Sequence, residues 1–115
     1  MTIKKLALAT LMLSCALPAS AQTVPDDVRC LMLSNFFTKA ATDDRAKQVA
    51  RQTLIFYLGR LDGRATPQAL TAAMRAQAPT IDPKAAGPAM NACAARLGKA
   101  QQAVQAASRA IVPAK

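Results

Sequence analysis

The chain has 115 residues, which is room for one domain, and its composition excludes several kinds of chemistry. It contains no His, so the commonest general base and metal ligand is missing, and it carries a formal charge of +9 with six acidic residues, all Asp. Neither a CxxC pair, a zinc-ligand spacing nor a phosphate-binding Gly-rich loop occurs in the sequence. We therefore expect a small basic protein that is not an enzyme, with no catalytic residues, no metal site and no cofactor.

The first 21 residues have the layout of a secretory signal peptide. A basic start is followed by an apolar run over residues 6–17, and the small residues Ala-Ser-Ala end at Ala21. A membrane-spanning helix needs about 20 apolar residues, more than this run contains. We expect cleavage between Ala21 and Gln22, which leaves residues 22–115 as a single helical domain in the periplasm or outside the cell.

Cys15 permits another interpretation, in which the protein is a lipoprotein anchored through this residue. The three preceding residues, Met-Leu-Ser, match a lipoprotein signal poorly, because that signal places Leu first and small residues after it. The Ala-Ser-Ala site is the better match, so cleavage after Ala21 is the main prediction.

The first mature helix is expected over residues 27–41. Asp26 or Asp27 can cap it, and both carboxylates favour the positive end of its dipole. Apolar residues then recur at helical spacing, with three more that widen the stripe: Val28, Cys30, Leu31, Met32, Leu33, Phe36, Phe37 and Ala40. Two aromatic residues at this spacing are usually core, and a surface contact site is the alternative.

A central helix is expected over residues 43–62, after the capping signal Thr-Asp-Asp. Its residues 54–58, LIFYL, point in all directions round the axis, and a helix that is apolar all round must be covered on every side. Gly59 in the interior indicates close approach of another helix, and Gly63 is placed to end the helix. This segment is predicted to be the centre of the fold.

Two further helices are expected, over residues 67–78 and 83–112. Thr66-Pro67 and Asp82-Pro83 are start signals, and Pro79 stops the third helix. The last helix carries a seven-residue rhythm typical of a bundle seam, in two series: Met90, Leu97, Val104 and Ile111, and Ala86, Cys93, Ala100 and Ala107. Gly98 can divide this helix, and its last 15 residues are expected to extend past the bundle or to fray.

Two cysteines remain after removal of the signal peptide, Cys30 and Cys93. An even pair in an exported protein predicts a disulfide, which the chain-entropy model values at about 4 kcal/mol. The bond would join the first helix to the last. The predicted fold is therefore all-α, a small four-helix bundle with one disulfide.

The layout of residues 30–93 resembles the periplasmic acid-stress chaperones of the HdeA/HdeB type and their small relatives. The resemblance is carried by RCL over residues 29–31, FYLGRLDG over residues 56–63 and MNAC over residues 90–93. It implies a helical bundle with one disulfide that binds unfolding client proteins after acid loosens it.

Two functions follow as hypotheses. The first is a small exported, non-catalytic protein that acts in the cell envelope by binding a protein partner, as an immunity or inhibitor protein does. The second is an acid-stress chaperone that exposes its aromatic residues to unfolding clients when the bundle opens. The candidate interaction surface is made up of Phe36, Phe37, Ile55, Phe56 and Tyr57.

Anionic partners are a further possibility, because the mature chain keeps a charge of about +7. An anionic membrane or cell wall could be bound by scattered basic residues: Lys47, Arg51, Arg60, Arg64, Arg96 and Lys99. Nucleic acid is not expected as a partner, because stacking surfaces for single strands interleave aromatic with basic residues, and here the aromatics lie within an apolar block.

Overall fold

A computed structural model describes residues 23–112, and they confirm the all-α prediction. The elements are α1 (Val24–Ala40), α2 (Asp44–Asp62), α3 (Pro67–Gln77), the 3-10 turn η1 (Ala78–Thr80) and α4 (Ala86–Ile111). The predicted signal peptide, the cleavage site between Ala21 and Gln22, and Cys15 lie outside the described residues. No helix between Val24 and Ile111 combines the length and the hydropathy that crossing a membrane requires.

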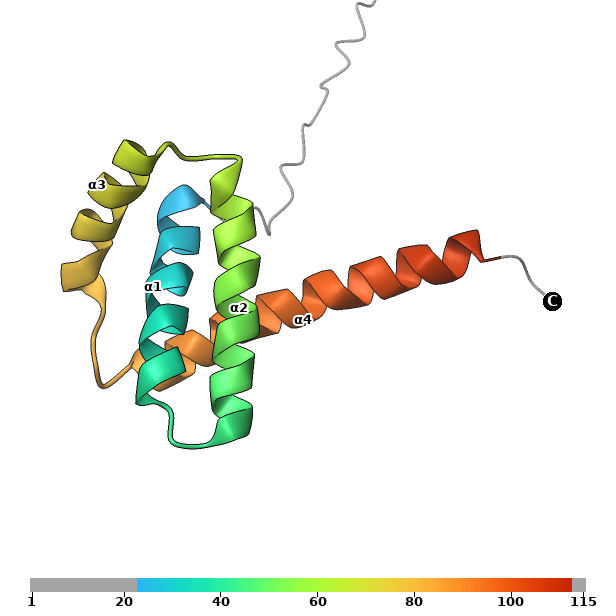
Figure 1. Ribbon diagram of the computed structural model, residues 1–115, viewed down its shortest axis with the longest axis horizontal. Coiled ribbons are helices and arrows are strands. Elements are labelled where there is room, and N and C mark those ends of the chain that lie inside the picture. Colours follow the sequence, from blue (N-terminus) through green and yellow to red (C-terminus); the bar gives the residue numbers. More distant parts are fainter. Residues whose placement is uncertain (1–22, 113–115) are drawn as a thin grey trace, which may run out of the picture.

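The helices do not form a bundle of four aligned rods (Figure 1). α1 and α2 run antiparallel after a short turn, and α3 packs on α1. α4 crosses α1 and α2 at a steep angle and then continues away from them. The 26 residues of α4 span about 39 Å. Because α4 crosses the α1–α2 pair instead of running along it, only the first part of α4 can pack on these two helices.

α1 begins three residues before its predicted start, because Thr23 caps it. The Thr23 side chain accepts a hydrogen bond from the Asp26 backbone N–H, and the Asp26 carboxylate accepts one from the Thr23 N–H. This is a capping box, with Pro25 in the first turn, where its missing N–H costs nothing. Asp26 thus takes part in the cap, as expected for one of the two Asp residues, whereas the Asp27 carboxylate binds two arginines.

α4 begins three residues after its predicted start. The Asp82 carboxylate and carbonyl accept hydrogen bonds from the N–H groups of Lys84 and Ala85, which makes a turn there instead of a helix. Helix geometry then holds from Ala86 to Ile111 and includes Gly98, so the last helix is continuous.

Of the two expectations about glycines, one was wrong and one is confirmed. A side chain at Gly59 would meet nothing within 4 Å, so no other described helix approaches closely there. Gly63 ends α2 as its C-cap, as expected, with right-handed backbone geometry (φ −86°, ψ −2°) that any residue adopts.

The core lies where α1, α2 and the start of α4 meet. Its ten buried apolar residues come from these three helices: Val28, Cys30, Leu31, Leu33, Ala50, Tyr57, Leu61, Ala86, Met90 and Cys93. α3 contributes no buried residue and packs through half-buried Leu70, Ala73 and Met74.

The prediction that α2 is covered on every side was wrong. Ile55 is 68% and Leu58 51% exposed, whereas Ala50, Thr53, Tyr57 and Leu61 on the opposite side are buried. The physical reason is that α4 crosses α2 instead of running along it, so it shields only a short part of the helix.

The seven-residue seam of α4 is used over only part of its length. Met90 and Cys93 are buried and Leu97 is half-buried, but Val104 is 66% and Ile111 81% exposed. The second half of α4 therefore extends past the core as a helix, as its length predicted.

Candidate functional site

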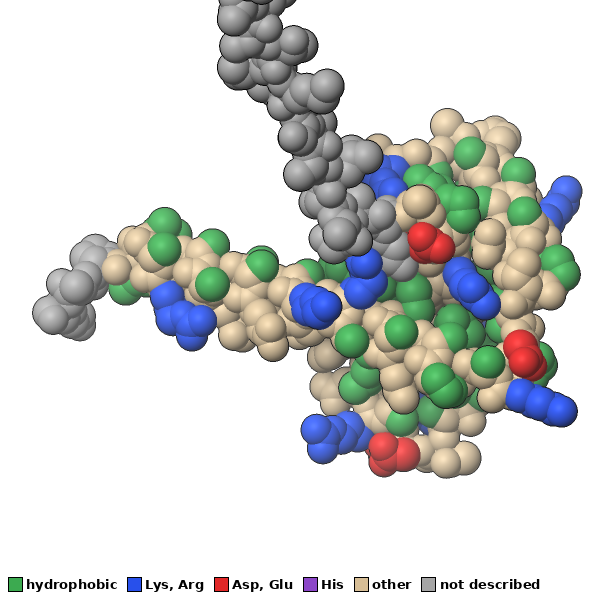
Figure 2. Space-filling model, turned by 180° about the vertical axis from the view of Figure 1, so that it is seen from behind, with side chains coloured by type: hydrophobic (Ala, Val, Ile, Leu, Met, Phe, Trp, Pro, Cys, Tyr) green, Lys and Arg blue, Asp and Glu red, His purple; other side chains and the backbone are tan. Residues whose placement is uncertain are grey.

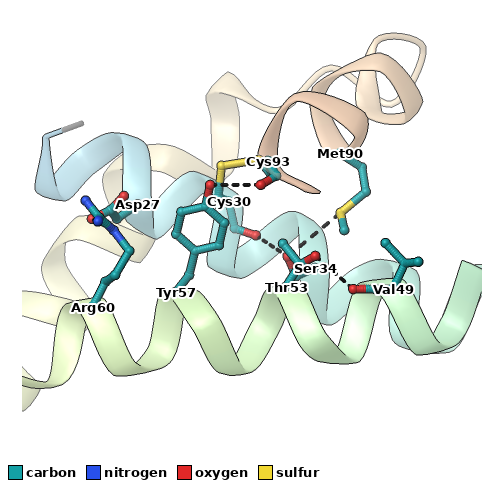
Figure 3. Close-up of a disulfide and its surroundings, with 9 residues drawn as sticks. All are labelled: Asp27, Cys30, Ser34, Val49, Thr53, Tyr57, Arg60, Met90 and Cys93. Carbon is teal, nitrogen blue, oxygen red and sulfur yellow. Dashed lines mark hydrogen bonds and ion pairs between the residues drawn. A yellow bond between two sulfur atoms is a disulfide. The ribbon is translucent and has the colours of Figure 1, made fainter. Parts of the chain in front are cut away.

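The predicted disulfide between Cys30 and Cys93 is present, and it fastens α1 to the crossing helix α4 (Figure 3). Its Cα atoms are 5.5 Å apart, and 63 positions separate the two residues in the chain. Tyr57 of α2, fully buried beside it, donates a hydrogen bond of 3.1 Å to the Cys93 carbonyl. The bond and the tyrosine together tie three helices at one point.

Asp27 forms an ion-paired cluster that the sequence did not reveal. Its side chain is fully buried, and one carboxylate oxygen, Oδ2, accepts hydrogen bonds from Arg60 Nε at 3.0 Å and from Arg64 Nη1. Both arginines lie near the end of α2 and remain about one-third exposed. Of the two Asp residues considered as caps of α1, Asp27 instead links the start of α1 to the end of α2.

The candidate interaction residues do not form one surface. Tyr57 is buried, and Phe37 is half-buried against the core. Phe56 is half-buried where α2 meets α4, with Arg60 Cζ 5.6 Å from its ring centre. Phe36, expected to be core, is 58% exposed, and Ile55 is also exposed. Only Phe36 and Ile55 of the predicted set are open to a partner in this state.

An apolar groove runs between α1, α2 and α3 beside Phe36. Its volume is about 700 Å³, and α1 provides most of its lining. The lining residues are Leu31, Met32, Asn35, Phe36, Lys39, Ala40, Leu54, Leu58 and Met74. Phe36 and Leu58 stand more than half exposed on its two sides, and Lys39 is the one charged residue in the lining.

The wall of the groove formed by α3 is held without a fully buried side chain. Since α3 buries no residue fully, little apolar surface resists its displacement. Met32 and Met74 face the groove from α1 and α3, and methionine is a flexible side chain that adapts to irregular ligands. The groove can therefore change width at modest cost.

Sequence reasoning took Leu58 as covered, and it did not single out the half-buried Met32 and Met74 as residues that line a groove. The sequence of α2 did contain an indication that some apolar residues are exposed. Its apolar block at residues 54–58 is wider than one crossing helix and one antiparallel neighbour can cover. Ile55, which was singled out, lies outside the lining of the groove.

The basic residues considered for anionic partners are divided between separate places. Arg60, Arg96 and Lys99 line one hollow of about 270 Å³ with Phe56, at the crossing of α2 and α4. Arg60 and Arg64 bind Asp27. Lys47 lies near the other end of α2, about 20 Å from Arg60 along the axis. Figure 2 shows basic side chains dispersed among tan and green ones on that face.

Within residues 23–112, no three His, Cys, Asp or Glu side chains gather in a way that could hold a metal ion. The two described cysteines are joined to each other. In comparisons with known proteins, no family model, no curated protein and no solved structure matches this chain.

Proposed function

We propose that this protein is a small exported, non-catalytic helical protein that binds a protein partner in the cell envelope through the groove beside Phe36. The observation that carries the proposal is the pair of large apolar side chains, Phe36 and Leu58, that stand exposed on either side of a groove of about 700 Å³. Exposed apolar patches that are contiguous and rimmed by polar residues mark contact sites in soluble proteins.

The shape and lining of the groove favour an apolar segment, most naturally one face of a helix. Helices α1 and α2 lie side by side, and an amphipathic helix binds between such neighbours with apolar anchors spaced three or four residues apart. The lining is uncharged apart from Lys39, which can pair with an acidic residue beside those anchors. The disulfide joins α1 to α4, and Tyr57 of α2 hydrogen-bonds to the Cys93 carbonyl, so α1 and α2 are held at one point while α3 adjusts to the ligand.

Phe36→Asp should abolish capture of the partner. The change places a charge at the centre of the apolar contact, and we expect affinity to fall at least about 100-fold, as for a central interface residue. Since Phe36 is more than half exposed, the fold should keep its stability. The measurement is affinity capture from an envelope extract with the oxidised protein, followed by titration of the purified partner by calorimetry.

Ile55→Asp is the matched control, because it introduces the same charge at an equally exposed apolar residue of α2 outside the groove. Binding should survive this change. Recovery of no stoichiometric partner by the unmodified protein, or loss of binding with Ile55→Asp but not with Phe36→Asp, would contradict the proposal.

Acid-stress chaperone activity is the second candidate, and the ion-paired cluster at Asp27 favours it. The Asp27 carboxylate, bound by Arg60 and Arg64, is the charged contact that joins the start of α1 to the end of α2. The chaperone hypothesis requires acid to loosen the fold at a charged contact of this kind. Opening at this place would help to uncover Tyr57, which is fully buried in the closed fold.

Light scattering of an aggregating client tests this second candidate. The protein should suppress aggregation at pH 2–3 and not at pH 7, and the oxidised and reduced forms should both be measured. A protein that stays compact and inactive at pH 2 would rule the chaperone function out and leave the groove proposal unaffected.

A further inference from the structure

The second half of α4 forms an arm, residues 100–111, which leaves the core after half-buried Ala100. Every residue from 101 to 111 is exposed, and Figure 1 shows the arm leaving the core without a neighbour. The arm continues a helix that the core already nucleates, but no tertiary packing adds to the stability of its exposed residues, and most helical stability in proteins comes from such packing. The arm would therefore gain stability from a partner along one of its faces.

One face of the arm is apolar and continues the packed seam of the core. Val104 and Ile111 repeat the spacing of buried Met90, and Ala100 and Ala107 repeat that of buried Cys93. Figure 2 shows apolar side chains along one edge of the projecting segment. The arm thus presents two large and two small residues in alternation, on the side that faces α1 and α2 nearer the core.

The charges on the arm exclude an acidic partner for this face. Between residues 100 and 111 the sole charged residue is Arg109, five positions after Val104 and hence on the opposite side of the helix. A face without charge is matched by another uncharged apolar face. We propose that its occupant is the same arm of a second copy of this chain, packed antiparallel.

The alternation makes the arm complementary to itself in one register. With the two-fold axis between residues 105 and 106, Val104 lies opposite the partner's Ala107, and Ala100 opposite the partner's Ile111. Each large side chain then meets a small one, which lets the helices approach closely. Gln101 lies beside the partner's Ser108, where the two can form a hydrogen bond, so no charged groups face each other along the seam.

The position of the core selects the antiparallel orientation. Because the seam faces α1 and α2, a second helix lying on it in parallel would bring its own core into the space of the first. The antiparallel pair places the two cores at opposite ends. The partner's Ile111 then reaches a hollow of about 510 Å³ at the base of the arm, lined by Phe56, Leu97 and Val104 among others. The dipoles of the two helices are then antiparallel, which is the electrostatically favourable arrangement.

Sedimentation of the exported, oxidised protein between 1 and 500 µM tests the pairing. The interface is small, so we expect a weak dimer whose population rises through the micromolar range. Val104→Glu should make the protein monomeric throughout. Gln102→Glu introduces the same charge on the outer side of the same helix and should leave dimerisation unchanged. Both variants should keep the helical circular dichroism and the disulfide of the unmodified protein.

Spin labels at single introduced cysteines test the orientation. Residue 105 lies next to the proposed axis, whereas the two copies of residue 99 lie about 20 Å apart along the helices. The distance between labels should thus be clearly longer for Lys99→Cys than for Gln105→Cys, while a parallel pair predicts similar distances.

Three results would overturn the proposal: a monomer at 500 µM, a Val104→Glu protein that still dimerises, or equal label distances. Dimerisation lost with Phe36→Asp and kept with Val104→Glu would show instead that the groove, not the arm, binds the second copy. Failure of the arm to pair would leave binding of a different protein in the groove untouched.

Discussion

Replacing both Arg60 and Arg64 with Ala is expected to lower the free energy of unfolding by about 3–5 kcal/mol, because it strands a buried carboxylate. The Asp27 side chain is fully buried, and its Oδ2 atom receives hydrogen bonds from both arginines. Its other oxygen, Oδ1, has no hydrogen-bond partner among the described residues. Without the arginines the charge would lie in the protein interior with nothing to balance it. Urea unfolding at neutral pH measures the loss.

Removing the charge of Asp27 instead of the two arginines should lower the free energy of unfolding much less. Asp27→Asn keeps the shape of the side chain, and the two arginines, about one-third exposed, remain solvated by water. We expect a loss of about 1–2 kcal/mol, since mainly hydrogen bonds to charged groups are weakened. Arg45→Ala with Arg51→Ala removes the same charge from exposed positions of α2 and should change stability by no more than about 1 kcal/mol. Equal losses for the Asp27 and arginine variants would contradict the proposed asymmetry.

Removing the disulfide should have an effect of similar size. The double variant Cys30→Ala with Cys93→Ala is expected to lose about 4 kcal/mol, because the bond closes a loop of 63 positions in the unfolded chain. Domains of this size are stable by only about 5–15 kcal/mol, so the reduced protein should be partly unfolded at 37 °C. Urea unfolding with and without reductant measures the difference.

Reductant should leave the free energy of unfolding of the double variant unchanged. This control shows whether the reductant affects stability through groups other than the disulfide. The intact mass of the protein isolated from the producing cell, before and after reduction, reports the bond and tests the predicted mature start at Gln22 and the alternative of a lipid on Cys15 in one measurement. Two titratable thiols in the native oxidised protein would contradict the assignment.

The local sequence determined the helices and most of their ends. Thr66-Pro67 starts α3 as expected, with the Thr66 hydroxyl accepting from the Ala69 N–H, and Asp43 caps α2 in the same way. These signals act within four residues, so no tertiary information is needed to interpret them. Two cysteines behind an expected signal peptide likewise sufficed to predict the disulfide, because pairing depends on compartment and number.

The direction of α4, by contrast, was decided only by tertiary packing. The seven-residue rhythm of this helix predicted a seam and could not say how far another helix follows it. A steep crossing ends the contact soon after Cys93 and leaves Val104 and Ile111 exposed. It also uncovers Ile55 and Leu58 of α2, and so it creates the groove that the sequence did not predict.

The sequence by itself thus determined the helical class, the start signals and the cysteine pair, since each depends on short-range geometry or simple counting. Only the tertiary structure decided that Asp27 meets two arginines more than 30 positions away, that Phe36 faces solvent, and that half of α4 stands free. These outcomes depend on the angles at which the helices cross, and such angles arise from the summed packing of many side chains.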